Sequence, residues 1–255
     1  MTVFFYDKTF EGLLTAIFDT YKRKTVPDSL LENGAILPMF CTETHEVISD
    51  EEKSGRVWKS LEKKLSKYSL NMLMLVWLSE EPGSDMLLFR YICKCIDSKE
   101  NQETSFADSD TLEAHNIAKK VAHEQLYIKQ FVRFQKTADG IFFAPIAPRH
   151  NALPLTIDHF KDRYSDQKWI IYDTVRNYGY FYDLHKVEEI TINADSASFA
   201  NIAPELLAEN EGLYQEMWSE YFKALTIKER LNLRLQKQHM PKRFWNNITE
   251  MKRRK

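Results

Sequence analysis

The sequence predicts an α+β fold, in which a small antiparallel sheet of about five strands packs against several helices and a basic helical segment ends the chain. Three observations support this prediction. In the N-terminal half, apolar residues recur every 3.6 positions, as in amphipathic helices. In the middle of the chain the pattern changes to short runs rich in β-branched and aromatic residues, separated by turn dipeptides. Only 7 glycines and 8 prolines occur among 255 residues, too few for an all-β protein with a turn every ten residues.

The N-terminal half is expected to be mostly helical after a first strand at residues 2–6. The polar stretch 24–48 shows no period. Ser49 and Glu52 have the spacing of a capping box, which predicts a helix start, and Ser84 is expected to cap a later helix. The predicted helices of this half cover residues 9–22, 49–68, 70–78, 84–96 and 110–128.

The middle of the chain is expected to contain two strand pairs. Asp139-Gly140 is a strong hairpin signal because both residues tolerate positive φ, and Asn177-Tyr178-Gly179 is expected to form the second turn. A short helix is predicted at 155–164. The predicted strands, which join residues 2–6 in one sheet with helices on one face, are 131–136, 141–147, 169–174 and 180–184.

The C-terminal part returns to helical spacing. A stripe of apolar residues marks a helix that ends near Leu225. Thr226 and Glu229 then form a second capping-box pattern, which predicts a helix to about residue 238. Pro241 is placed to begin a last helix. We therefore divide the chain into an α+β body and a basic helical region packed on it. The body covers residues 1–203 (helical 9–128, strand-rich 130–192), and the basic region covers 204–255.

Several classes of protein are excluded by what the sequence lacks. The N-terminus has no signal-peptide pattern, and no apolar run approaches the roughly 20 residues that span a bilayer, so we expect a cytoplasmic protein away from membranes. The three cysteines have no disulfide or zinc-type spacing, and Cys95 fits a helix core better than a metal site. Scattered glycines exclude a Rossmann or P-loop motif. His123-Glu124 lacks the second histidine of a zinc protease, and no nucleophile elbow occurs.

The net charge of −2 conceals an uneven distribution. Residues 223–255 hold eleven Lys and Arg against two acids, a net charge of +9. The first 222 residues hold 24 Lys and Arg against 35 Asp and Glu, a net charge of −11. A basic helical end with aromatic and amide side chains suits a phosphate backbone and its bases. The alternative is that this end only offsets the acidic body, with Phe244 and Trp245 in the core.

A series of short motifs follows the chain from residue 6 to residue 250. They are Tyr6-Asp7-x-Thr9-Phe10-Glu11-Gly12-Leu13-Leu14-Thr15, Phe131-x-Arg133-Phe134, Asp139-Gly140, Pro148-x-His150-Asn151, Trp169-Ile170-Ile171-Tyr172-Asp173-x-x-Arg176, Ile227-x-Glu229-Arg230-x-Asn232, Gln236, and Met240-Pro241-Lys242-Arg243-Phe244-Trp245. In this order they resemble a bacterial family named "probable DNA metabolism protein". One departure is Lys8, where the family usually has glycine; it puts any role of Asp7 in doubt.

The resemblance implies a genetic setting. Genes of this family typically lie beside one for a radical-SAM protein assigned to DNA modification or repair, which we expect to be the partner of this chain. The sequence has no C-x-x-x-C-x-x-C motif. The resemblance therefore assigns any iron–sulfur cluster and S-adenosylmethionine to that partner, and no cofactor to this chain. Longer members carry a uracil-DNA-glycosylase-like domain, which we expect to be absent here together with its chemistry.

The candidate site residues fall into three groups. For nucleic-acid binding they are Arg230, Asn232, Arg234, Gln236, Lys242, Arg243 and Trp245. His150 and Asp173 are a possible acid–base pair, and further motif positions are Tyr6, Asp7, Asn151, Tyr172 and Arg176. Both a ligand-binding loop and a turn capped by Asn151 fit Pro148-x-His150-Asn151. An ion pair at a strand end is the favoured interpretation of Asp173 and Arg176. Asp158, His159 and Asp162 share a helix, but without a third ligand we favour a solvated face and expect no metal site.

Three functions remain as hypotheses. The first is a DNA-associated accessory protein that acts with a radical-SAM partner in DNA modification or repair. The second is an enzyme acting directly on damaged or modified DNA, with His150 and Asp173 as the acid–base pair. The third is a protein adaptor without nucleic-acid contact, whose basic end only neutralises the body.

Overall fold

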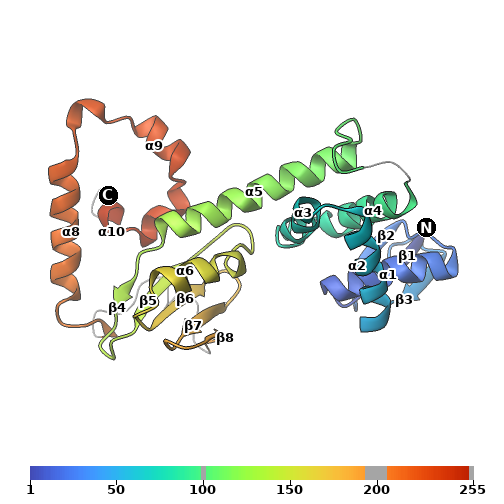
Figure 1. Cartoon of the computed structure of the whole chain (residues 1–255), viewed down its shortest axis with the longest axis horizontal. Helices are drawn as coiled ribbons and strands as arrows, with labels where there is room; N and C mark the ends of the chain where they lie inside the picture. Colours follow the sequence, from blue (N-terminus) through green and yellow to red (C-terminus); the bar gives the residue numbers. More distant parts are fainter. Residues whose placement is uncertain (99–101, 193–205, 253–255) are drawn as a thin grey trace. The chain divides into compact units, whose positions relative to one another are not determined.

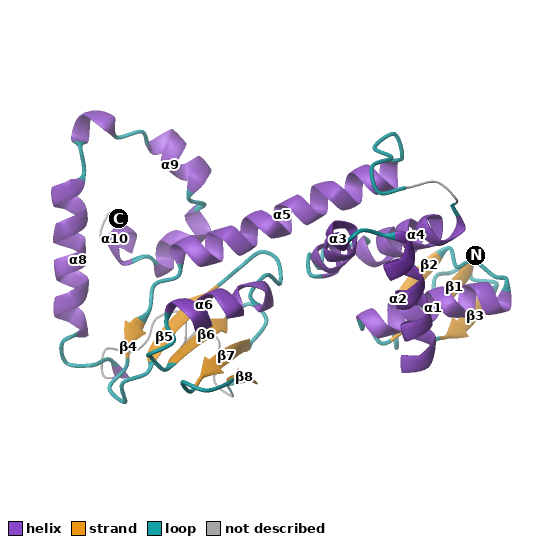
Figure 2. Ribbon diagram, viewed as in Figure 1, coloured by secondary structure: helices purple, strands orange, loops and turns teal. Residues whose placement is uncertain are grey.

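The computed structural model describes residues 1–98, 102–192 and 206–252. The chain divides into two compact units, Met1–Ala122 and His123–Lys255. Figure 1 colours the elements along the chain, and Figure 2 separates helices from strands. The division falls inside the helix α5 (Ser109–Phe131), which contributes its first turns to one unit and its last turns to the other. The boundary that the sequence predicts, between residues 203 and 204, lies outside the described residues.

The N-terminal unit is built on a three-stranded parallel sheet in the order β2-β1-β3. Its strands are β1 (Thr2–Tyr6), β2 (Ser29–Glu32) and β3 (Glu43–Glu46). The helices of the unit are α1 (Phe10–Arg23), α2 (Glu51–Lys64), α3 (Lys67–Trp77), α4 (Ser84–Asp97) and the start of α5. Their buried apolar faces form one core with β1, as the 3.6-residue period predicts.

The C-terminal unit contains a five-stranded sheet in the order β4-β5-β6-β7-β8. The strands are β4 (Gln135–Lys136), β5 (Phe142–Ile146), β6 (Trp169–Asp173), β7 (Tyr178–Tyr182) and β8 (Val187–Ile190). A short 3-10 turn, η1 (Pro154–Thr156), and the helix α6 (Ile157–Arg163) connect β5 to β6. Phe160 of α6 packs its ring against Trp169, which fixes this helix on the sheet.

Short helices complete the C-terminal unit. They are α8 (Glu211–Leu225), the 3-10 turn η3 (Lys228–Arg230), α9 (Leu233–His239), the 3-10 helix η4 (Lys242–Asn247) and α10 (Thr249–Lys252). Phe244, Ile248 and Met251 are buried in a small core with Tyr127 and Phe131 of α5. The last helix predicted from Pro241 is thus divided into the 3-10 helix η4 and α10, which pack on α5. The α+β class is confirmed with its five-stranded sheet.

The membership of that sheet differs from the prediction. Residues 2–6 belong to the other unit, and β8 takes the fifth place. Strands β5 and β6 are parallel, because α6 carries the chain back to the same end of the sheet, and the remaining pairs are antiparallel. Asn177 has a φ of +57° and ends the turn before β7. Gly179 lies inside β7, where a Cβ would collide with the carbonyl oxygen of Ile171.

Three predicted helix caps are also wrong. Asp50, not Ser49, caps α2, because its side chain accepts a hydrogen bond from the Lys53 amide at 3.0 Å. Gly83 occupies the cap position before α4, so Ser84 is the first helical residue. The pattern at Thr226 starts no regular α-helix: the Thr226 hydroxyl donates back to Phe222, and Asn232 caps α9 instead.

Candidate nucleic-acid interface

The exposed cations of the basic end lie on three consecutive short elements of the C-terminal unit, η3, α9 and η4. Arg230 belongs to η3, and Arg234 belongs to α9, whose N-terminus is capped by the Asn232 side chain accepting from the Leu235 amide at 3.0 Å. Lys237 lies one turn further along α9, and Lys242 begins η4. All four cations are exposed. None of them forms an ion pair with the described part of the chain.

Arg243 has a different role. Its guanidinium pairs with both carboxylate oxygens of Glu124 on α5, a side chain that is only 3% exposed. The same carboxylate accepts the Arg149 amide at 2.8 Å. The guanidinium also lies over the rings of Phe244 and Tyr127, 4.9 and 5.9 Å from their centroids. Arg243 therefore fastens η4 to α5, and its charge neutralises a buried acid.

Trp245, the aromatic candidate for base stacking, belongs to the core cluster at this point. It is half-buried against Phe244, Ile248 and Met251, and its indole N–H donates to the Met240 carbonyl at 3.0 Å. The second buried acid of the cluster, Glu250, accepts from Arg133 at 2.9 Å and from the Trp218 indole at 2.8 Å. Burial opposes ionisation of Glu250, but these hydrogen bonds outweigh it and hold its pKa below the usual range.

An open pocket of about 450 Å³ lies between the last turns of α5 and α9. Its lining residues are His123, Leu126, Tyr127, Gln130, Phe131, Gln236, His239 and Met240. Aromatic, amide and imidazole side chains thus line one concavity, and the cations of α9 are carried by the helix that forms one of its walls. Of the residues predicted from sequence, only Gln236 lines it. The signal that sequence reasoning missed is the aromatic pair Tyr127 and Phe131, four residues apart on one helix face.

The remaining motif residues of this unit gather at the ends of the parallel strands β5 and β6. Asp173 is fully buried and accepts from the Val175 amide at 2.8 Å and from the Arg176 guanidinium at 2.9 Å. Arg176 also donates to the carbonyls of Pro148 and Arg149, at 3.2 and 3.1 Å. Burial raises the pKa of Asp173 above its usual range, even though Arg176 lowers it.

His150 and Asn151 belong to the loop that Arg176 holds. His150 is 3% exposed, and the Asn151 amide oxygen accepts from the Tyr178 hydroxyl. Tyr172 is buried within β6. A general base must reach the proton that it removes. The near-complete burial of His150 and Asp173 therefore favours a structural corner over an acid–base pair.

Tyr6 and Asp7 lie in the other unit, at the turn from β1 to α1. The Tyr6 hydroxyl donates to Asp85 at 3.0 Å, and Lys8 pairs with the same carboxylate at 2.7 Å. Asp7 accepts from Thr9 and from Ser49, each at 2.7 Å, which explains why Ser49 is not the cap of α2. Burial opposes ionisation of Asp7, but these donors outweigh it and lower its pKa. Lys8 has a φ of +57°, a conformation that glycine adopts without steric cost.

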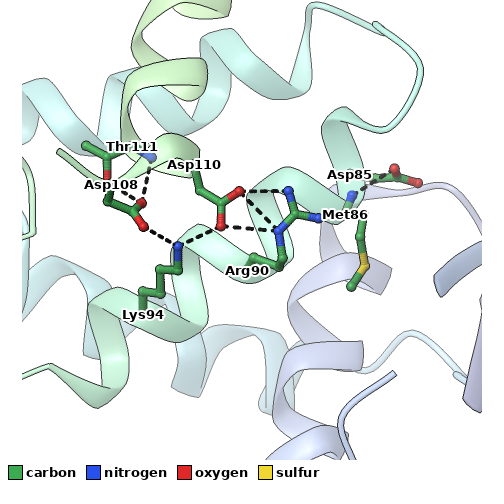
Figure 3. Close-up of polar contacts among 7 residues, drawn as sticks. All are labelled: Asp85, Met86, Arg90, Lys94, Asp108, Asp110 and Thr111. Carbon is green, nitrogen blue, oxygen red and sulfur yellow. Dashed lines mark hydrogen bonds and ion pairs between the residues drawn. The ribbon is translucent and has the colours of Figure 1, made fainter. Parts of the chain in front are cut away.

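The N-terminal unit also holds a pocket of about 770 Å³, lined in part by Tyr21, Phe89, Arg90, Cys93 and Lys94. Two of its cations, Arg90 and Lys94, are already engaged in ion pairs. Arg90 and Lys94 reach from α4 to Asp110 at 2.8 and 2.7 Å, and Lys94 also reaches Asp108 (Figure 3).

Asp108 in turn accepts from the Thr111 amide at 2.9 Å, so this network fixes the start of α5 on α4. Within the described ranges, no three His, Cys, Asp or Glu side chains are arranged to hold a metal ion. Nor does any described helix combine the length and apolar character needed to cross a bilayer.

The fold and the site define an α+β protein with a basic helical end. The chain belongs to the family of the domain of unknown function DUF4130, whose model matches residues 82–250. This match covers α4 and nearly all of the C-terminal unit, including the basic helices and the pocket between α5 and α9. No curated protein and no solved structure matches the chain.

Proposed function

We propose that the protein is a DNA-associated accessory protein that acts with a radical-SAM partner in DNA modification or repair. One observation carries the proposal: α9, which lies between the exposed cations of η3 and η4 in the sequence and carries two itself, also forms one wall of a pocket of aromatic and amide side chains. Cations neutralise phosphates, and such pockets hold bases. The resemblance to a DNA-metabolism family supports the same conclusion.

The charges of the basic end support binding over simple neutralisation. Arg243 offsets the buried Glu124, and Lys223 pairs with Glu220 at 2.6 Å. The cations between residues 228 and 242 are exposed and form no ion pair with the described residues: Lys228, Arg230, Arg234, Lys237 and Lys242. With Glu229 counted against them, these five cations leave a surplus of four positive charges over one short stretch, which attracts a polyanion and repels other cationic surfaces.

The helix α8 supports the involvement of a protein partner. Large apolar side chains on it are exposed, each by more than two fifths of its surface: Leu213, Tyr214, Met217, Trp218, Tyr221 and Leu225. Contiguous apolar surface of this kind marks interaction sites in soluble proteins. The identification of the partner as a radical-SAM protein rests on the family resemblance, and the iron–sulfur cluster and S-adenosylmethionine are assigned to that partner.

The DNA part of the proposal is tested by salt titration of labelled single- and double-stranded DNA, followed by fluorescence anisotropy. The test variant is Arg230→Gln/Arg234→Gln/Lys237→Gln, which keeps Arg243 and its pair with Glu124. The matched control, Lys59→Gln/Lys63→Gln/Lys67→Gln, removes three exposed charges from the N-terminal unit. Each phosphate contact contributes about 0.9 to the log–log slope on duplex DNA. The test variant should lower the slope by about 2 to 3 and the control by far less.

A second candidate function is the adaptor without nucleic-acid contact, which the apolar face of α8 favours by itself. It predicts that wild-type protein does not bind DNA at low salt, while a partner still co-purifies and is lost in Tyr221→Glu. Salt-sensitive DNA binding that is equal in wild type and in the α9 variant would remove the basic helices from the proposal.

A further inference from the structure

We infer that the pocket between α5 and α9 binds one unstacked nucleobase of a strand whose phosphates are held by the cations of α9. This inference rests on the proposed function and specifies its substrate: single-stranded or locally opened nucleic acid. The volume of about 450 Å³ lies within the range of small-molecule sites and accommodates a base with its sugar.

The aromatic wall of the pocket is rigid. Tyr127 and Phe131 lie one above the other on α5, with ring centroids 5.9 Å apart and an angle of 20° between planes. The buried Phe244 supports both rings from behind, at 5.9 and 5.7 Å. A base entering the pocket would meet aromatic surface already fixed by the core, so stacking would cost little side-chain entropy.

Each of the two helices that form the pocket carries an amide that can bond the edge of a base. Gln236 on α9 and Gln130 on α5 offer amides, each with donors and an acceptor. The Gln236 amide nitrogen has a methionine sulfur as partner, Met251 at 3.8 Å, and thioethers are weak acceptors. A base edge would replace that contact with a stronger hydrogen bond.

The charge around the pocket suits a nucleotide. The eight described residues that line it include neither Asp nor Glu. Arg234 and Lys237 are exposed on α9, and Lys237 directly follows the lining residue Gln236. An apolar side chain of a peptide would fill the aromatic part of the pocket but would use neither the amides nor these cations. The combination therefore favours a nucleotide over a peptide.

The test uses a ten-unit DNA strand of abasic residues that carries a single 2-aminopurine, and the same strand with no base. Both present the same phosphates, so they differ only in the group available to the pocket. Stacking changes 2-aminopurine emission, and anisotropy of an end label gives the affinity. The test variant is Gln236→Ala, and the matched control is Gln238→Ala, an exposed amide on the same helix outside the pocket.

We expect wild type to bind the strand with the base at least five-fold more tightly than the strand without it, with a fall in 2-aminopurine emission. In Gln236→Ala the ratio of the two affinities should fall about five-fold, which is the effect of about one hydrogen bond. In Gln238→Ala the ratio should stay at the wild-type value. Equal affinity of wild type for the two strands would overturn the pocket inference but leave DNA binding intact. Equal losses of preference in Gln236→Ala and Gln238→Ala would do the same. No wild-type binding of either strand or of unmodified DNA at low salt would overturn the proposed function itself.

Discussion

Arg176 is expected to be the main support of the corner where β5 and β6 end, and Arg176→Met tests this. Among the described residues, its guanidinium is the only side-chain group that donates a hydrogen bond to Asp173, and it also donates to the loop carbonyls of Pro148 and Arg149. The variant keeps an apolar stem of similar length but leaves Asp173, which is fully buried, without its ion-pair partner.

The expected loss is about 3 kcal/mol in the stability of the C-terminal unit at pH 7. Removing one partner of a buried ion pair costs roughly 3–5 kcal/mol, because the other charge stays desolvated. Two backbone amides, those of Val175 and Arg176, still donate to Asp173 at 2.8 and 3.2 Å. They place the loss at the lower end of that range, about two powers of ten in the unfolding equilibrium.

The loss should shrink on acidification. The pKa of Asp173 in the folded state is already raised by burial, and removing Arg176 raises it further, since Arg176 acts to lower it. A raised folded-state pKa contributes stability below the unfolded pKa of about 3.9, and this contribution is lost as pH rises through the folded value. The variant therefore loses stability over a wider pH range than wild type, and near pH 4 the difference falls to the cost of the hydrogen bonds from Arg176 to Pro148 and Arg149.

Hydrogen exchange measured by mass spectrometry follows the C-terminal unit within the full chain. Peptides from β5, β6 and β7 are compared over a urea series at pH 7 and pH 4.5. Lys223→Met is the control, because the pair of Lys223 with Glu220 is exposed on both sides and should contribute less than about 0.5 kcal/mol. A loss in Arg176→Met no larger than in the control, or equal at both pH values, would refute the assignment of Asp173 as a buried charge supported by Arg176.

Three further predictions concern other parts of the chain. Gly179→Ala should destabilise the C-terminal unit by about 1–3 kcal/mol, because its Cβ would lie 2.9 Å from the Tyr172 Cα. Gly212→Ala, whose Cβ would lie in open space on α8, should stabilise the unit by up to about 1 kcal/mol. Urea melts of the two variants measure both changes. The pKa of Asp110 is lowered mainly by its hydrogen bonds from Arg90, so the N-terminal unit should lose stability as pH falls below about 3.9. This loss of stability in acid should be smaller in Arg90→Met, and thermal melts from pH 2 to 7 measure it. Lys8→Gly should remove the cost of a positive φ, about 1–2 kcal/mol, but it also takes the cation from Asp85, whose side chain is only 12% exposed, so a net fall in melting temperature is expected.

The sequence predicts the helices better than the strands, for a physical reason. Helices such as α1 bury a continuous apolar face, which leaves a period in the sequence. The strand β3 is the segment Glu-Thr-His-Glu and has no apolar period; its pairing with β1 makes it a strand. The edge strand β8 has two glutamates in four residues and gives no stronger signal. The parallel pairing of β5 and β6 depends on where α6 returns the chain, which no local pattern specifies.

The candidate site follows the same distinction. The charge of the basic end can be read from the sequence because charge adds along the chain without reference to the fold. Arg243 neutralises Glu124, whereas Arg234 and Lys237 face solvent. This difference depends on a contact between residues more than a hundred positions apart, which no local pattern shows. The pocket is invisible for the same reason, since Tyr127 and Gln236 meet only when α9 folds back towards α5.

The division of the cations into paired and unpaired side chains also bears on the proposed DNA binding. A residue such as Arg243 cannot be replaced without leaving Glu124 buried and uncompensated, so its presence says little about DNA. The exposed cations carry no such constraint: within the described residues, folding uses none of the side chains of Arg230, Arg234 or Lys237 in an ion pair. Mutual repulsion among them disfavours the isolated fold slightly. Their accumulation on one short stretch therefore calls for a reason outside the fold, and the nucleic acid that we propose as ligand would supply it.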